Sequence, residues 1–176
     1  LLDFQFEVLT TYLNDGNRKP ERSRYNNAHA YLSAPYGIYK TKDTYIAISM
    51  TPVPALGDLL KLNTITKYTD PKEWFSKRDE IKKLIGDWLL TETTSHWLSI
   101  LQPKDIWCSE VLEWDKMIEH EGFKVLDMLQ KIVRSDGLNL ETLRCPIRIN
   151  KEIFKSEVAA PLIGQHNEEI IKDYNL

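Results

Sequence analysis

The chain contains few of the residues that build metal centres or disulfide frameworks. Its 176 residues include two cysteines and four histidines: Cys108, Cys145, His29, His96, His120 and His166. No histidine lies three or four residues from another histidine or from a cysteine, so the spacing predicts no zinc site. The two cysteines form neither a paired metal-binding motif nor a disulfide framework, and each lies beside strand-like residues. We expect both to be free, buried thiols.

Glycine is also scarce, and its scatter excludes the phosphate-binding loops. The seven glycines never cluster, so no glycine-rich nucleotide loop is predicted. The Gly-x-Ser-x-Gly sequence of a hydrolase nucleophile is missing as well. Cys108 or Ser109 could in principle pair with a distant histidine, but a thiol packed in a strand is the favoured interpretation. The residues by themselves predict no self-contained active site and no cofactor, and they favour a binding or scaffolding role.

Strong charge of one sign and long apolar runs are absent. The formal net charge is −3, and lysines and arginines are interspersed with acidic residues, so we expect no binding to nucleic acid or to an anionic membrane. No apolar run approaches the roughly 20 residues that a membrane-spanning helix needs, and no signal-peptide pattern opens the chain. We therefore predict a cytoplasmic protein. Because the chain begins at Leu1, without Met and inside an apolar pattern, we also expect a piece of a longer polypeptide.

The residues that are present have the composition of a globular domain, with 42% hydrophobic residues, five tryptophans and charges of both signs. The stretch APYGIYKTKDTYIAIS, residues 34–49, holds two segments of alternating apolar and polar residues separated by KTKD. This pattern predicts a β-hairpin. A solvated linker, residues 14–24, is expected to connect it to an N-terminal helix over residues 1–13. The apolar face of that helix is wide enough to need burial on most of its circumference.

Several helices are predicted after the hairpin. A short one is expected over about Pro54–Leu60, and Asp70 with Pro71 forms the capping pattern of the next. The clearest helix has apolar residues at helical spacing and polar residues on the opposite side: Ile81, Leu84, Ile85, Trp88 and Leu89 against Asp79, Lys82, Lys83 and Asp87. Thr93 or Thr94 is expected to cap a further helix that turns Trp97, Leu98 and Leu101 inward and ends before Pro103.

The remaining sequence predicts strands and a final helix. DIWCSEV, residues 105–111, has the length of a strand, and LEWDKMIEH after it has weak helical spacing. Residues 123–133 are ambiguous between helix and strand. Asp136 and Gly137 form a turn signal that favours a second hairpin between LQKIV and NLETLR. An extended segment and a break at Pro and Gly follow, and a helix is expected from about Asn167.

Three pieces of the sequence resemble, in family order, the class III CoA transferases (the CaiB/BaiF family). Residues 34–49 resemble the pattern AP-x-G-x-Y-x-T-x-DG-x-I-x-I, with Thr44 in place of the glycine after Asp43. SHWLSILQPKDIWCSEV resembles the passage ending in IPCAPV; Trp97, Leu98, Cys108 and Val111 match, whereas Trp107, Ser109 and Glu110 replace Pro, Ala and Pro. APLIGQHNEEII resembles the closing P-x-LG-x-H-x-x-E-x-L pattern through Pro161, Gly164, His166 and Glu169. The resemblance spans Leu1 to about Tyr174.

The resemblance implies an enzyme that moves CoA between an acyl-CoA and a carboxylic acid. In this family, which includes formyl-CoA and carnitine CoA-transferases, an aspartate attacks the thioester, forms a mixed anhydride and becomes an aspartyl-CoA intermediate. That aspartate lies upstream of the segment resembling LLDFQFEVL, and Asp3 does not match it. The resemblance therefore implies that this chain holds no catalytic residue and is inactive alone. Coenzyme A is implied as a substrate and not as a cofactor.

The resemblance also implies a substrate-side loop that includes His29, Ala34, Pro35, Tyr36 and Gly37. In formyl-CoA transferase-like members a glycine-rich loop just before the hairpin closes over the aspartyl intermediates and shields them from water. The tract His29–Gly37 has one glycine, which implies a different acceptor or a less mobile lid. An ordinary linker packed on the hairpin is the alternative.

The expected fold class is α+β, a small antiparallel sheet flanked by helices. The N-terminal helix and a C-terminal arm would pack on a Rossmann-like large domain outside the chain. Residues 1–27 are assigned to a helix and linker of that large domain, 28–120 to the small domain, and 121–176 to a returning C-terminal segment. A homodimer is implied for the intact protein. Two alternatives stay open: an acyl-CoA racemase or epimerase of the same fold, and a non-catalytic dimerisation or binding module.

Overall fold

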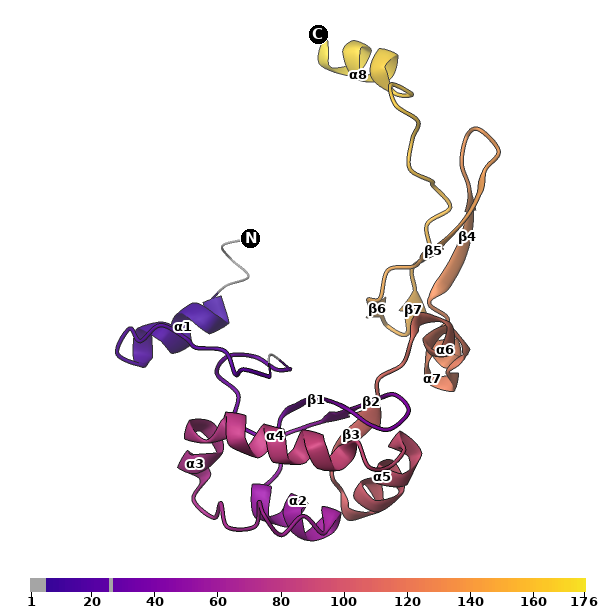
Figure 1. Ribbon diagram of the computed structural model, residues 1–176. Coiled ribbons are helices and arrows are strands. Elements are labelled where there is room, and N and C mark those ends of the chain that lie inside the picture. The colour runs from indigo at the N-terminus through magenta and orange to yellow at the C-terminus, as the bar shows by residue number, and fades with distance from the viewer. Residues whose placement is uncertain (1–5, 26) are drawn as a thin grey trace. The chain divides into compact units, whose positions relative to one another are not determined.

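The fold consists of two separately packed units. The structure, a computed structural model, describes residues 6–25 and 27–176 (Figure 1). The chain divides between Val111 and Leu112. The domain limits expected from the sequence, at residues 27/28 and 120/121, remain predictions. Both units combine helices with small antiparallel sheets, so the predicted α+β class is confirmed.

A three-stranded antiparallel sheet in the order β1-β2-β3 organises the first unit. The elements of this unit are α1 (Phe6–Asn14), β1 (Gly37–Lys40), β2 (Tyr45–Ile48), α2 (Val53–Leu60), α3 (Pro71–Ser76), α4 (Arg78–Leu89), α5 (Thr94–Leu101), the 3-10 helix η2 (Gln102–Lys104) and β3 (Cys108–Glu110). β1 and β2 form the predicted hairpin, with Gly37 opposite Ile48 and Lys40 opposite Tyr45. β3 is the predicted strand within DIWCSEV and pairs with β2.

The two faces of this sheet differ because side chains alternate along a strand. Tyr39, Ile46 and Ile48 are buried, whereas Ile38 and Tyr45 are about half exposed. Helix α4 contacts β1, helix α5 contacts β3, and helix α2 contacts α5. Together they enclose the core: Ala34, Tyr39, Ile46, Ile48, Val53, Leu56, Leu60, Leu62, Ile65, Tyr68, Ile81, Ile85, Leu89, Trp97 and Leu101.

The predicted helix caps are confirmed in two places. The Asp70 carboxylate accepts a hydrogen bond from the Lys72 backbone N–H at 2.9 Å, and Pro71 occupies the first turn of α3. The Thr93 hydroxyl accepts from the His96 N–H at 3.3 Å at the start of α5. Each cap satisfies one of the N–H groups that a helix start leaves without an intrahelical partner.

Helix α4 follows its predicted apolar stripe but not its predicted polar side. Ile81, Ile85 and Leu89 are fully buried, whereas Trp88 is 36% exposed. Lys82 was expected on the solvated side and is instead completely buried. Its position borders the apolar stripe, and its ammonium group donates a hydrogen bond to Asn27 Oδ1 at 2.9 Å. That prediction is wrong because a polar acceptor from a distant segment offsets the cost of burying the amine.

The linker before the hairpin is mostly exposed, but its end is attached to α4. Ser23 is buried, and its hydroxyl donates to Asp79 Oδ1 at 2.7 Å. The same oxygen accepts the Arg24 backbone N–H at 2.9 Å. The expectation of a fully solvated linker is therefore wrong at Ser23, because the Asp79 carboxylate in the first turn of α4 accepts hydrogen bonds from this part of the linker.

The leading helix presents apolar side chains to solvent where the structure describes it. Leu9 is 51% exposed and Leu13 is 60% exposed. The first part of the predicted helix, residues 1–5 with Asp3, lies outside the described residues. For Leu9 and Leu13, the sequence-based expectation that this helix lacks a cover within the chain agrees with their exposure.

The second unit is built from short elements with little buried surface. These are α6 (Trp114–Glu119), α7 (Glu121–Leu126), β4 (Leu129–Val133), β5 (Asn139–Leu143), β6 (Arg148–Ile149), β7 (Glu152–Ile153) and α8 (Asn167–Tyr174). β4 and β5 form the predicted second hairpin, and Gly137 has the positive φ of 86° that its turn requires. The ambiguous residues 123–133 divide into the end of α7 and strand β4. Helix α8 begins at Asn167 as predicted.

Arg144 is the one buried side chain among the residues described in this unit. Its guanidinium donates to the backbone carbonyls of Leu126, Asp127 and Cys145, so these hydrogen bonds join the end of α7 to the end of β5. Cys145 follows β5 and is exposed. The prediction that it is buried is wrong because no second layer among the described residues covers this hairpin. Cys108, in the first unit, is partly buried. Both cysteines are free, as expected.

Candidate functional site

The tract His29–Gly37, expected to be the substrate-side loop, is fixed at its C-terminal end by the core. The Ala34 N–H donates to the Trp74 carbonyl at 2.9 Å, and the Pro35 carbonyl accepts the Tyr39 hydroxyl at 2.6 Å. Burial raises the pKa of this Tyr39 hydroxyl, which stays neutral and able to donate. Ala34 and Pro35 are both fully buried. These two predicted site residues therefore pack in the core and do not face an open site.

The other three predicted site residues line one groove beside the sheet. Its volume is about 700 Å³, within the range of small-molecule sites. The described lining residues come from the tract and from all three strands: Asn27, Ala28, His29, Tyr36, Gly37, Ile38, Ala47, Ile48, Ser49, Trp107, Cys108 and Ser109. The structure thus brings His29, Tyr36 and Gly37 together, and their roles remain predictions. We refer to this feature as the sheet groove.

Gly37 is needed at the groove because Asn27 approaches its backbone closely. A Cβ atom at position 37 would lie 2.6 Å from Asn27 Nδ2, well inside contact distance. Asn27 holds this position through two bonds to Ile38: its carbonyl accepts the Ile38 N–H, and its Nδ2 donates to the Ile38 carbonyl, both at 3.2 Å. Asn27 thereby covers the outer edge of β1, where an uncovered strand would leave these groups unpaired.

The ammonium group of Lys82 holds the Asn27 side chain in place by donating a hydrogen bond to Asn27 Oδ1. Burial lowers the pKa of its ammonium group, with the neighbouring Arg78 charge acting in the same direction and Asp79 opposing it. Sequence reasoning did not find Asn27 or Lys82, because their contact joins residues 55 positions apart. Trp107 could be singled out from the sequence, because it is an aromatic residue where the family pattern has proline. It lies at the groove and is 76% exposed.

The sheet groove is lined by polar and apolar side chains. The described lining holds no Asp, Glu, Lys or Arg. His29 Nδ1 accepts the Tyr31 N–H at 3.3 Å, so in the neutral ring the proton is assigned to Nε2, which is a donor. Burial raises the pKa of the Cys108 thiol, which lowers its thiolate fraction and disfavours it as a nucleophile. Hydroxyls and an imidazole can orient a ligand here, and Ile38 and Trp107 can contact its apolar part.

The motif residue Asp43 has a structural task away from the groove. Its Oδ1 accepts the Thr94 N–H at 2.8 Å and the hydroxyls of Thr41 and Thr94 at 3.0 and 3.1 Å. These bonds, led by the one from the Thr94 backbone, lower the pKa of Asp43. Thr44 is not among the described residues with positive φ, so the position that is glycine in the family pattern accepts threonine here without strain.

Other classes of site find no support in the described part of the chain. Within residues 6–25 and 27–176, no group of three or more histidine, cysteine or acidic side chains is placed to hold a metal ion. Among the same residues, no helix has the length and apolar character needed to cross a membrane.

Curated proteins similar to the chain include CoA-transferases and a racemase. The chain is 22% identical over 106 residues to (R)-2-hydroxy-4-methylpentanoate CoA-transferase of Clostridioides difficile, covering 60% of this chain and 27% of that protein. It is 25% identical over 107 residues to formyl-CoA:oxalate CoA-transferase of Rhodopseudomonas palustris, covering 60% and 25%. It is 23% identical over 141 residues to alpha-methylacyl-CoA racemase of Homo sapiens, covering 79% and 36%. The matches span about a quarter to a third of these relatives.

Solved structures share the fold. A CaiB/BaiF family protein from Brucella suis superposes with a TM-score of 0.64 at 20% identity, covering 96% of this chain and 44% of that chain. A hypothetical protein from Mycobacterium tuberculosis superposes with a TM-score of 0.62 at 18% identity, covering 95% and 43%. The sequence model of CoA-transferase family III matches residues 2–167. On this match over nearly its whole length, the chain belongs to CoA-transferase family III.

Proposed function

We propose that this chain is the small-domain and C-terminal portion of an enzyme that moves CoA between an acyl-CoA and a carboxylic acid. The reaction would pass through an aspartyl-CoA intermediate whose aspartate lies outside this chain. The observation that carries the proposal is the family match over residues 2–167, to which the curated CoA-transferases add support. The described lining of the sheet groove agrees with it, because the groove offers binding groups and no ionised nucleophile.

In this proposal the sheet groove forms the wall against which the acyl group or the acceptor acid lies. His29 Nε2 and the Tyr36 hydroxyl would orient polar atoms of the substrate, and Trp107 would exclude water from the thioester. A mixed anhydride is short-lived in water, so such a wall would favour transfer over hydrolysis. The absence of charged side chains among the described lining residues favours a substrate whose body carries no charge beyond its carboxylate.

A second candidate is an acyl-CoA racemase or epimerase of the same fold. One curated relative is named alpha-methylacyl-CoA racemase. In a racemase the neutral groove would hold the acyl chain while a base elsewhere exchanges the proton next to the thioester carbonyl. We further propose that the intact protein is a cytoplasmic homodimer, in keeping with the expectation from its family.

The test uses the full reading frame that encodes this chain. The purified product is incubated with a panel of acyl-CoA donors and carboxylic acids in deuterated water, and the products are analysed by mass spectrometry. New acyl-CoA species, together with a CoA adduct on an aspartate, are expected of the transferase. Deuterium next to the thioester carbonyl without transfer would select the racemase. If neither product forms with any pair, a non-catalytic binding module replaces both proposals.

A further inference from the structure

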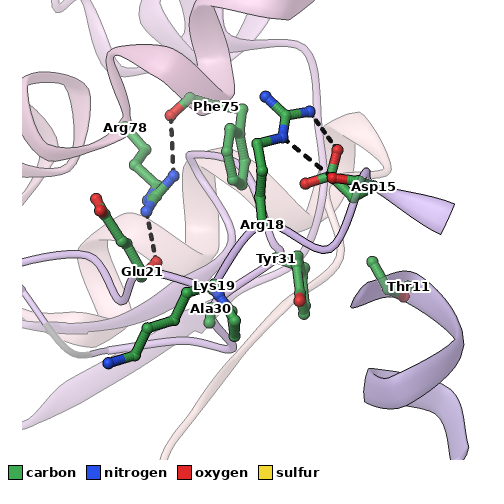
Figure 2. Close-up of a pocket in the computed structure, with 10 residues that line it drawn as sticks. Thr11, Asp15, Arg18, Lys19, Glu21, Ala30, Tyr31, Phe75 and Arg78 are labelled. Carbon is green, nitrogen blue, oxygen red and sulfur yellow. Dashed lines mark hydrogen bonds and ion pairs between the residues drawn. The ribbon is translucent and has the colours of Figure 1, made fainter. Parts of the chain in front are cut away.

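A second cavity is lined in part by other residues of the same tract, Ala30 and Tyr31. It has a volume of about 720 Å³ and is bounded by α1 and the segment after it, by Ala30 and Tyr31, and by the junction of α3 and α4 (Figure 2). Its lining residues are Thr11, Asp15, Arg18, Lys19, Pro20, Glu21, Ala30, Tyr31, Phe75 and Arg78. None of them lines the sheet groove, so the two cavities have different described lining residues.

Arg78 forms a fixed wall of this cavity. Its guanidinium lies 4.2 Å from the centre of the Phe75 ring and donates to the Glu21 carbonyl at 2.6 Å (Figure 2). These contacts leave the Nε–H of Arg78 buried without a hydrogen-bond partner among the described residues. The hydroxyl of Tyr31, in the same lining, is also buried and without a partner there. Buried donors in native proteins are nearly always satisfied, so these two atoms indicate a missing acceptor.

The charges around the cavity indicate the nature of that acceptor. The carboxylate of Asp15 is paired with Arg18 (Figure 2). Of the remaining charged side chains in the lining, Lys19 and Arg78 are cationic and Glu21 is anionic, which leaves one positive charge in excess. A guanidinium, an ammonium and a hydroxyl together supply donors of the kind that hold an oxyanion.

We propose that this cavity binds a small molecule through a phosphate or carboxylate group. The oxyanion accepts hydrogen bonds from Arg78 Nε–H and the Tyr31 hydroxyl after a small displacement that opens these shielded atoms, and Lys19 provides the nearby charge. The ring of Phe75 is available to an apolar part of the same ligand. The inference rests on this cavity alone and holds whether or not the sheet groove serves CoA transfer.

The test measures binding of inorganic phosphate and of succinate to the full chain by calorimetry and by thermal unfolding, with sodium chloride at matched ionic strength as the reference. Either anion is expected to raise the unfolding midpoint above the chloride reference and to saturate. Saturation by phosphate alone would assign a phosphoryl ligand, and saturation by succinate alone a carboxylate ligand. Failure of both anions to bind at millimolar concentration would overturn the proposal. Ordered water would then be the hydrogen-bond partner of Arg78 Nε–H and of the Tyr31 hydroxyl.

Variants distinguish anion binding in this cavity from non-specific anion binding elsewhere on the protein. Tyr31→Phe removes only a hydroxyl and is expected to weaken anion affinity about tenfold without lowering the midpoint in the absence of anion. Glu21→Gln removes the opposing charge and should tighten binding. The matched controls Tyr45→Phe and Lys104→Gln alter an exposed tyrosine and an exposed lysine outside the cavity and should leave affinity unchanged. Equal affinities for Tyr31→Phe and the parent chain would contradict the assignment.

Discussion

At the scale of single residues, close approach decides which positions are restricted. Gly37 and Gly86 are both glycines near the core, but their surroundings differ. A side chain at Gly37 would collide with Asn27 at 2.6 Å, whereas one at Gly86 would meet Tyr39 Cδ1 at an ordinary 3.8 Å. The residue type is therefore required at the first position and not at the second, although the sequence shows the same letter at both.

This difference predicts opposite effects of the same substitution. Gly37→Ala is expected to lower the free energy of unfolding by about 1–3 kcal/mol, because Asn27 must move and lose its bonds to Ile38. Gly86→Ala, inside α4, is expected to raise it by about 0.5–1 kcal/mol, because alanine loses less backbone entropy in a helix. Urea denaturation of the two variants provides the measurement. A Gly37→Ala protein as stable as the parent chain would show that Asn27 does not hold this edge.

Residue-scale predictions from sequence succeeded where the signal was local. Asp70 and Thr93 cap helices as their positions indicated, because a cap depends on only three or four neighbouring residues. Lys82 and Ser23 were assigned to solvent and are buried, because their partners lie more than 50 positions away along the chain. A one-dimensional pattern contains no information on such partners.

At the scale of elements, Asp43 joins the turn of the β1–β2 hairpin to the start of α5. Its carboxylate accepts the Thr94 N–H at the first position of the helix, where the partial positive charge of the helix terminus favours an anion. The Lys42 N–H donates to the Glu92 carbonyl at 3.0 Å beside it. In this chain Asp43 therefore docks two elements against each other.

The pH dependence of stability follows from this arrangement. The pKa of Asp43 is lowered from its ordinary value of 3.8 in the folded protein, so the ionised carboxylate is the form that stabilises the fold. Its contribution is complete above the ordinary pKa and is lost as the pH falls through the lower folded value. Asp43→Asn should therefore be less stable than the parent chain at neutral pH.

The stability gap between Asp43→Asn and the parent chain should narrow as the pH is lowered below about 3.8. Denaturant midpoints measured from neutral pH downward test this. Asp58→Asn serves as the matched control, because Asp58 is exposed on α2 and, within residues 6–25 and 27–176, no comparable side-chain bond ties it to another element. A stability difference that does not change with pH would mean that Asp43→Asn acts through the altered hydrogen-bonding groups of the side chain and not through the loss of its charge.

Element types were predictable where periodicity and turn signals agreed. Both hairpins and helices α2 to α5 and α8 were located from alternation, capping residues and the Asp136–Gly137 turn. The site was only partly predictable. The tract was found by resemblance, yet Ala34 and Pro35 are buried in the core while His29, Tyr36 and Gly37 line the groove. The direction in which a loop residue faces depends on packing against Trp74 and Tyr39, which the local sequence does not encode.

At the scale of the whole molecule, stability is expected to be unevenly distributed. The buried apolar residues belong to the first unit, and Arg144 is the one buried side chain described after Val111. Because apolar burial is the main favourable term in folding, local opening in residues 112–176 should require much less free energy than opening of the first unit.

Hydrogen exchange measured by mass spectrometry on the full chain tests this distribution. Amides of β1, β2, α2, α4 and α5 are expected to exchange at least about a hundredfold more slowly than those of β4, β5 and α8. Peptides from helix η2 and from α1 should show intermediate or fast exchange, since both are largely exposed. Equal protection in the two units would indicate that the second unit gains a cover in solution, by self-association or by binding another protein.

The exposed thiol of Cys145 has a practical consequence. A maleimide dye or nitroxide added at neutral pH should attach to it first, because the other thiol of the chain is partly shielded and its pKa is raised by burial. Energy transfer from the five native tryptophans to a dye on Cys145 would then report conformational changes of the C-terminal half. No engineered mutation would be needed.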